Sequence, residues 1–149
     1  MNYFGYGGNL DLPFLREFCP SAEFIRKAYL PNYEVQFRYW SPRRQGGVSS
    51  IIAVPGKLVH GVIYDIRAEE LQALDAMEGV PEGRYRRETF LVIGDDGKWY
   101  DADLYSVVEP KGPFIPNKGY VELMLAGAKA WEFDPEYIKW IEELYSKSE

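Results

Sequence analysis

The sequence predicts an α+β fold in which a mixed, curled or barrel-like β-sheet is flanked by helices. Strand-like segments follow one another along most of the chain, and they are joined mainly by turn signals typical of hairpins. Segments with helical periodicity are inserted among them and also close the chain. Since no repeat, low-complexity run or linker interrupts this order, we expect residues 1–149 to form one domain.

The N-terminal segment predicts a strand, a glycine-rich loop and then a short helix. Aromatic residues within positions 3–6 favour a strand, and the glycines that follow favour a tight turn or the close approach of another group. Asp11 is suited to cap a helix over 11–18, with Pro13 in its first turn. Exposed N–H groups in such a loop can form a small anion-binding concavity; an ordinary glycine turn is the alternative.

The next segment predicts two strands and a polar loop. Residues 22–30 are strand-like, and Pro31 with Asn32 indicates a turn. Residues 33–40 alternate between apolar and polar side chains, which predicts an amphipathic strand. The polar loop that follows carries Arg43 and Arg44, and we interpret it as a solvated connector.

Two further strand segments precede the first long helix. Residues 50–54 predict a strand that ends at a turn formed by Pro55 and Gly56. The strand pattern resumes over 58–66, where Gly61 is a possible bulge.

A helix is predicted over 68–77, where Leu71 and Leu74 are three residues apart, with Gly79 just past its end. Glu78 then falls at the negative end of the helix dipole, and partial burial would also raise its carboxyl pKa. A raised pKa suits a general base, while a surface carboxylate without function is the alternative.

The C-terminal third predicts a hairpin, an irregular loop and two helices. Strands over 84–93 and 99–108 flank a turn at 94–97, and the prolines of 110–117 indicate a stiff loop. The first helix covers 118–131 and contains small residues that favour close packing. Asp134 and Pro135 supply the cap and first turn of the last helix, which has an apolar stripe.

Composition excludes several classes of function. The net charge of −6 lacks the electrostatic basis of nucleic-acid binding. No apolar run is long enough to span a bilayer, and the N-terminus has no signal-peptide pattern. Cys19 is the single cysteine, which prevents an intramolecular disulfide and fits a reducing compartment. We therefore expect a cytoplasmic protein.

His60 is the only histidine, so a zinc site or a histidine-dependent catalytic triad is not expected. It lies in a strand-like run, and we expect a half-buried strand residue. We expect no metal site, and any catalysis should depend on carboxylates and tyrosines.

Several motifs occur in a fixed order along the chain: Tyr-Phe-Gly-Tyr-Gly-Gly-Asn-Leu at 3–10, Pro-Gly at 55–56, Gly-Val-Ile-Tyr at 61–64, Leu-Asp at 74–75, Glu-Gly at 78–79, Tyr85, Tyr105, Tyr120 and Ala-Gly-Ala at 126–128. This ordered set resembles the γ-glutamylcyclotransferase family over nearly the whole chain. The opening motif of that family is usually Tyr-Gly-Ser-Asn-Leu. Here Gly8 stands in place of the serine, so a side-chain hydroxyl is lost while the backbone donors remain.

The resemblance implies a mixed barrel with flanking helices and an enzyme that needs no cofactor. It implies that Glu78 matches the catalytic glutamate. The positions that match substrate-binding residues, or lie near the site in the case of Tyr85, are Tyr3, Phe4, Gly5, Tyr6, Gly7, Gly8, Tyr120 and Tyr85.

The implied reaction is the cyclisation of a small γ-glutamyl amide or amino acid to 5-oxoproline, with release of the free amine. The substrate's own α-amine attacks its γ-carbonyl group, and Glu78 would act first as general base and then as general acid. Two alternatives are a non-catalytic binding module that uses the same pocket, and a structural protein that uses its tyrosines as a contact surface. The sequence leaves open the leaving amine and the oligomeric state.

Overall fold

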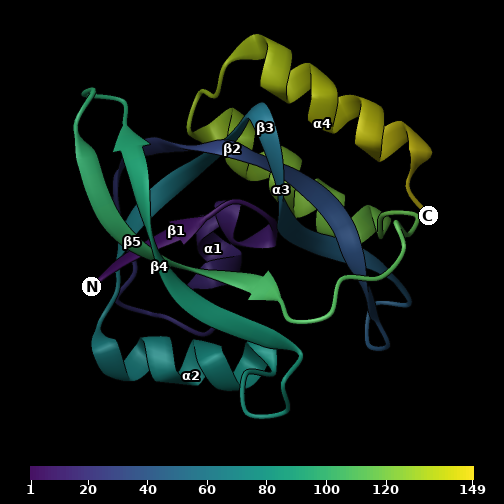
Figure 1. Ribbon diagram of the computed structural model, residues 1–149, viewed down its shortest axis with the longest axis horizontal. Coiled ribbons are helices and arrows are strands. Elements are labelled where there is room, and N and C mark those ends of the chain that lie inside the picture. Colours follow the sequence, from purple (N-terminus) through teal and green to yellow (C-terminus); the bar gives the residue numbers. More distant parts are fainter.

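Five strands close into a barrel in the order β1-β3-β2-β4-β5 in the computed structural model, which describes residues 1–149 (Figure 1). The strands are β1 (Asn2–Gly5), β2 (Glu23–Ser41), β3 (Gly46–Asp65), β4 (Tyr85–Gly94) and β5 (Trp99–Val107). β1 pairs antiparallel with β3 and parallel with β5, so the sheet is mixed. The predicted α+β fold with a barrel-like mixed sheet is confirmed.

The helical elements are η1 (Gly8–Leu10), α1 (Leu12–Leu15), α2 (Ala68–Glu78), α3 (Lys118–Ala130) and α4 (Pro135–Lys147). α3 and α4 lie together on one side of the barrel, and α2 lies at its opposite end (Figure 1). The predicted caps are present, because the Asp11 carboxylate accepts from the Phe14 N–H and the Asp134 carboxylate from the Glu136 N–H. α1 is shorter than predicted, since bonds spanning three residues replace the helical pattern before Phe18.

Two predicted turns do not end strands. Pro31 and Asn32 lie within β2, and Pro55 and Gly56 lie within β3. Both sites do contain turn-like residues, since Asn32 has φ 67° and Gly56 has φ 86°. They face each other across the β2–β3 ladder, where the register shifts, and the Gly56 N–H donates to Asn32 Oδ1 at 3.0 Å. The irregular segment of β2 therefore pairs with the irregular segment of β3, and both strands continue beyond these segments.

The predicted bulge at Gly61 is also wrong, because Gly61 pairs in regular register with Ala28. A Cβ atom at this position would lie 2.6 Å from the Gly5 carbonyl oxygen and would also meet the Phe4 ring. The glycine is therefore needed for the close packing of β1 on β3. The predicted hairpin of β4 and β5, with its turn at 94–97, is confirmed.

The hydrophobic core lies inside the barrel and extends to the face of α3 that packs against it. Fully buried side chains from three elements meet there, among them Phe4, Leu104 and Met124. α3 packs closely on η1, because a Cβ atom at Gly127 would collide with the Leu10 carbonyl group. This confirms the predicted close packing of the small residues, and it brings the start of α3 to the N-terminal loop.

The two residues that the sequence left without a chemical role are packed in the structure. His60 is a half-buried strand residue, as predicted, and its ring stacks on Tyr137 with centroids 4.1 Å apart. Cys19 is buried and carries a free thiol. None of the helices has the length and apolar character needed to cross a lipid bilayer.

Candidate active site

A cavity of about 380 Å³ forms where the loop after β1, the β2–β3 turn, the end of α2 and the start of α3 meet. It is lined by most of the residues that the sequence selected, namely Tyr3, Tyr6, Gly7, Gly8, Glu78, Tyr85 and Tyr120. These residues come from four separate parts of the chain, and the barrel with its helices brings them to one place.

Phe4 and Gly5 do not line the cavity, in contrast to what the resemblance implied. The Phe4 side chain is fully buried in the core, and Gly5 pairs with Val62 on β3. Because side chains alternate along a strand, Tyr3 faces the cavity while its neighbour Phe4 points away from it. Both residues lie in the strand that leads into the loop, outside the cavity lining.

The Gly7–Gly8 loop begins η1 and leaves its first amide groups free within that turn. The Gly7 and Gly8 carbonyls accept from the N–H groups of Leu10 and Asp11, at 3.0 and 3.2 Å. The N–H groups at the start of such a turn have no earlier carbonyl to bind. The Gly8 N–H is directed at the Tyr120 hydroxyl oxygen, so the Gly7 N–H is the one that is available to an anionic or carbonyl oxygen.

Two hydroxyl groups lie directly against Gly7. The hydroxyls of Ser49 and Tyr120 are 2.6 Å apart, and a Cβ atom at Gly7 would collide with both oxygens. At Gly8, a Cβ atom would lie 3.0 Å from the edge of the Tyr120 ring. One proton lies between the two hydroxyls, so the pair retains a second proton that it can donate to a ligand.

The other tyrosine hydroxyls differ in whether their proton already makes a hydrogen bond within the protein. The Tyr85 hydroxyl donates to the Ser49 carbonyl at 2.9 Å, and the Tyr6 hydroxyl donates to the Tyr105 carbonyl. The Tyr3 hydroxyl instead accepts from Asn9 Nδ2 at 2.8 Å, so its own proton is free. Tyr6 and Tyr85 therefore hold the cavity wall, while Tyr3 can donate to a ligand.

Burial keeps these phenols protonated. Desolvation is the main cause that raises the pKa of Tyr3 well above its usual value, and the Glu78 charge adds to it. Desolvation also raises the pKa of Tyr120, although hydrogen bonds from Ser49 and the backbone oppose it. Both hydroxyls are consequently neutral donors near pH 7.

Glu78 is the last residue of α2, and Gly79 ends the helix with φ 76°. The Glu78 side chain is half-buried by surface area and lines the cavity. Desolvation there raises its pKa from 4.5 to about 7; Arg43 lowers it and Asp75 raises it further. The carboxyl group makes no hydrogen bond or ion pair with another residue, so it is free to exchange a proton with a ligand.

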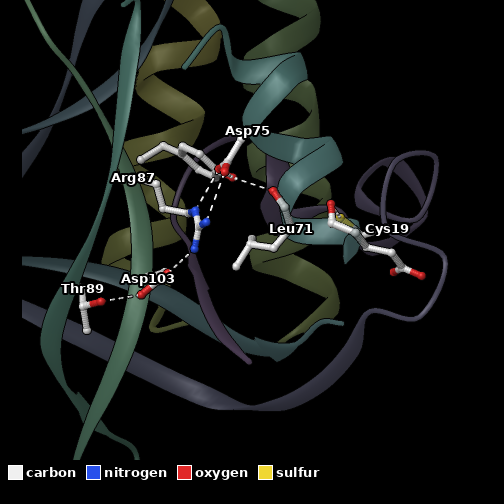
Figure 2. Close-up of polar contacts among 8 residues, drawn as sticks. Cys19, Leu71, Asp75, Arg87, Thr89 and Asp103 are labelled. Atoms are coloured by element: carbon white, nitrogen blue, oxygen red, sulfur yellow. Dashed lines mark hydrogen bonds and ion pairs between the residues drawn. The ribbon is translucent and has the colours of Figure 1, made fainter. Parts of the chain in front are cut away.

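A network of charged groups fixes the last turn of α2. Figure 2 shows Arg87 between Asp75 on α2 and Asp103 on β5. The Tyr105 hydroxyl donates to the same Asp75 carboxylate at 2.6 Å, and Thr89 donates to Asp103 at 2.6 Å. α2 is thus attached to the barrel three residues before Glu78.

The two arginines of the β2–β3 turn were wrongly interpreted as part of a solvated connector, since Arg43 and Arg44 line the cavity. Arg84, just before β4, lines it as well. The sequence did not distinguish these arginines from ordinary exposed loop residues. Only the pairing of β2 with β3, which sets where their turn falls, places them at the cavity.

Sequence reasoning also missed Ser49 and Asn9 as cavity residues. Ser49 directly precedes the strand predicted over 50–54 and has no distinguishing local signal, and Asn9 was included only as part of the motif at 3–10. Within the chain, no group of three or more His, Cys, Asp or Glu side chains is arranged to hold a metal ion.

Comparisons with known proteins agree with this fold and identify a family. Residues 58–141 match the AIG2-like family. The chain is 30% identical over 141 residues to a γ-glutamylcyclotransferase from Bos taurus, covering 92% of this chain and 74% of that protein. The Homo sapiens γ-glutamylcyclotransferase is also 30% identical, over 139 residues, covering 91% of this chain and 73% of that protein. A solved γ-glutamyl cyclotransferase superposes with a TM-score of 0.91 at 27% identity, covering 95% of this chain and 86% of the other.

Proposed function

The chain belongs to the AIG2-like family and is an enzyme of the cyclotransferase type, and we propose that it converts a small γ-glutamyl amide or amino acid to 5-oxoproline and a free amine. This membership confirms the resemblance to γ-glutamylcyclotransferases that the ordered motifs indicated. We further propose that it acts in the cytoplasm without a cofactor.

The observation that carries the proposal is the unpartnered Glu78 carboxyl group, whose pKa is raised to about 7, in the same cavity as the Gly7–Gly8 loop. A group with this pKa can accept a proton and return it near neutral pH. A carboxylate with the usual pKa of 4.5 would be a weaker base and would take the proton of the α-ammonium group far less readily.

The reaction moves two protons from the substrate's α-nitrogen to the departing nitrogen. Glu78 takes a proton from the substrate's α-ammonium group, and the amine nitrogen then attacks the γ-carbonyl carbon. The new C–N bond closes a five-membered lactam as the original γ-amide C–N bond breaks. Glu78 gives this first proton to the departing nitrogen, takes the second proton from the nitrogen that joins the ring, and passes it to the released amine, which leaves as its ammonium ion. One carboxyl group thus serves every transfer and ends as the carboxylate. Intramolecular attack removes much of the entropic cost of bringing the reactants together.

The remaining cavity groups suit the polar ends of such a substrate. The Gly7 N–H can bind the glutamyl carboxylate or the oxyanion that develops on the γ-carbonyl oxygen. Tyr3 and the Tyr120–Ser49 pair supply neutral hydroxyl donors beside them. The aromatic walls can pack against the methylene groups of the glutamyl chain.

The decisive experiment measures 5-oxoproline release from a panel of γ-glutamyl compounds by the parent protein and by Glu78→Gln. The amide keeps the side-chain shape but cannot accept the proton, so kcat should fall by about a hundredfold or more. Near-parental turnover in a folded Glu78→Gln protein would exclude the proton-transfer role. If the parent binds γ-glutamyl compounds without releasing 5-oxoproline, the binding-module alternative is correct instead.

A further inference from the structure

Three arginines line the cavity without an acidic partner. Arg43, Arg44 and Arg84 take part in none of the ion pairs of the chain. They face a single cavity carboxyl group, that of Glu78, in a protein whose net charge is −6. The local excess of positive charge opposes the overall charge, and it favours a ligand with more negative than positive groups.

Arg44 is the most firmly held of the three. Its backbone N–H donates to Ser41 Oγ at 3.1 Å, and its carbonyl accepts from Asn117 Nδ2 at 2.9 Å. Its guanidinium lies over the rings of Tyr120 and Phe14, 5.4 and 5.6 Å from their centroids. Burial is the main cause that lowers its pKa, although it remains charged.

The guanidinium is fixed by aromatic faces but makes no hydrogen bond within the chain, whereas the side chain of Arg87 binds two carboxylates. Contact with the aromatic rings does not use the guanidinium N–H donors, so they remain available for two parallel bonds to a carboxylate. Arg43 and Arg84 are exposed and lack this support. Arg44 is therefore the arginine that is preorganised for a carboxylate.

The position of Arg44 relative to the reacting groups limits which carboxylate it meets. The Tyr120 ring separates it from the reaction centre, since the ring's hydroxyl lies against Gly7 and Ser49 while its face contacts Arg44. In the proposed function the glutamyl part of the substrate already has partners: Glu78 for its amine, and the Gly7 N–H with the Tyr3 and Tyr120–Ser49 hydroxyls for its carboxylate. A second carboxylate, carried by the leaving group, would complete the charge balance of the cavity.

We infer that Arg44 is a specificity-determining residue that binds a carboxylate on the leaving amine, so that the enzyme prefers acidic leaving amines to neutral ones. The inference rests on the proposed function and deepens it. It favours a γ-glutamyl amino acid or peptide over a γ-glutamyl alkylamine or a γ-glutamyl group on a protein lysine, because those leaving groups have no carboxylate near the released nitrogen.

The test compares two substrates that differ only in that carboxylate, γ-glutamyl-alanine and γ-glutamyl-alaninamide. The parent should show kcat/KM at least about tenfold higher for the acid, the usual value of a charge-assisted hydrogen bond. Arg44→Gln should remove this preference, mainly by raising KM for the acid, and should leave kcat/KM for the amide within about threefold. Arg86→Gln, on an exposed arginine outside the cavity, is the matched control and should keep the preference.

Each contrary result has a distinct meaning. Equal kcat/KM for acid and amide in the parent overturns the inference and leaves the proposed function intact. A proportional loss for both substrates in folded Arg44→Gln also overturns it, because Arg44 would then be structural or would bind the glutamyl carboxylate. Absence of 5-oxoproline from every substrate overturns the proposed function and the inference with it.

Two further measurements keep the test valid if Arg44→Gln does not fold. Arg44→Lys retains the charge but not the planar pair of donors, so its preference for the acid should be intermediate. In the parent protein alone, free alanine should inhibit more strongly than alaninamide. Equal inhibition by the two, together with an unchanged acid preference in Arg44→Lys, would contradict the role of Arg44.

Discussion

Arg87 binds Asp75 through two nitrogens, with Nε–Oδ1 at 2.8 Å and Nη2–Oδ2 at 3.1 Å, and Asp75 lies three residues before Glu78 on the same helix. Asp75 and Glu78 are therefore neighbours on one helical face. Because Arg87 is on β4 and also binds Asp103 on β5, the ion pair fixes the end of α2 to the barrel. The position of the proposed proton-transfer group depends on this attachment.

We expect Arg87→Met to loosen the end of α2. It leaves two half-buried carboxylates with only the Tyr105 and Thr89 hydroxyls and no positive partner, so the free energy of unfolding should fall by roughly 1–3 kcal/mol. The kcat value should fall more than KM rises, because Glu78 would be misplaced while the substrate contacts remain. Chemical denaturation and steady-state kinetics measure the two effects. Arg86→Met, the adjacent exposed arginine, should change neither; similar losses in both variants would contradict the role of the Asp75–Arg87 pair.

The activity should depend on pH through Glu78. The general base must be ionised, and its pKa is raised to about 7, so kcat/KM should rise from acidic pH and level off above about pH 7. Arg43 lowers this pKa, and Arg43→Gln should therefore move the acidic limb to higher pH. Profiles of both proteins on one substrate test this, with Arg86→Gln as the control for loss of a remote arginine. An acidic limb that stays in place in Arg43→Gln would show that Glu78 does not control it.

The raised pKa of Glu78 also affects stability. At low pH the Glu78 carboxyl is protonated in both the folded and unfolded states, so its ionisation does not change the free energy of unfolding. As the pH rises from 4.5 to about 7, ionisation favours the unfolded state, and the penalty on the folded protein is complete above pH 7. Glu78→Gln should therefore match the parent near pH 4 and exceed it above pH 7, by at most roughly 3 kcal/mol.

Thermal unfolding across this pH range measures the difference, and Glu82→Gln on an exposed side chain controls for the loss of one negative charge. A stability gain for Glu78→Gln that is the same at pH 4 and pH 8 would show that ionisation of Glu78 is not its cause.

The two loop glycines should differ in their tolerance of a side chain. At Gly7 a Cβ atom would collide with the hydroxyls of Ser49 and Tyr120, whereas at Gly8 its nearest neighbour is the Tyr120 ring edge at 3.0 Å. Gly7→Ala should lower kcat/KM by at least about tenfold, because the added methyl group displaces this hydroxyl pair. A tenfold fall corresponds to only a modest loss of transition-state binding. Gly8→Ala, the matched control, should have a smaller effect. Equal kinetics for the two variants, with folding checked by circular dichroism, would contradict the close contact at Gly7.

The sequence alone determined features that depend on a few consecutive residues. Asp11 and Asp134 were identified as helix caps from the sequence. A cap depends only on a short side chain and on the free N–H groups of the next few residues, so it can be recognised locally. Gly79 marked the end of α2 because a left-handed residue is needed there, and this placed Glu78 at the helix terminus. The hairpin of β4 and β5 followed from its turn residues for the same reason. The ordered motifs then indicated the family, which the comparisons confirmed.

Tertiary structure decided what depends on residues far apart in the sequence. Pro31 with Asn32 and Pro55 with Gly56 have turn-like residues, but their mutual pairing keeps β2 and β3 continuous. Arg44 resembles any solvated loop arginine until barrel closure and α3 bring Phe14 and Tyr120 against it. Likewise, pairing with β3 puts Phe4 in the core and not in the cavity. Local sequence fixes backbone conformation over one turn or one strand pair, whereas the surroundings of a side chain depend on long-range register and packing, which no short segment encodes.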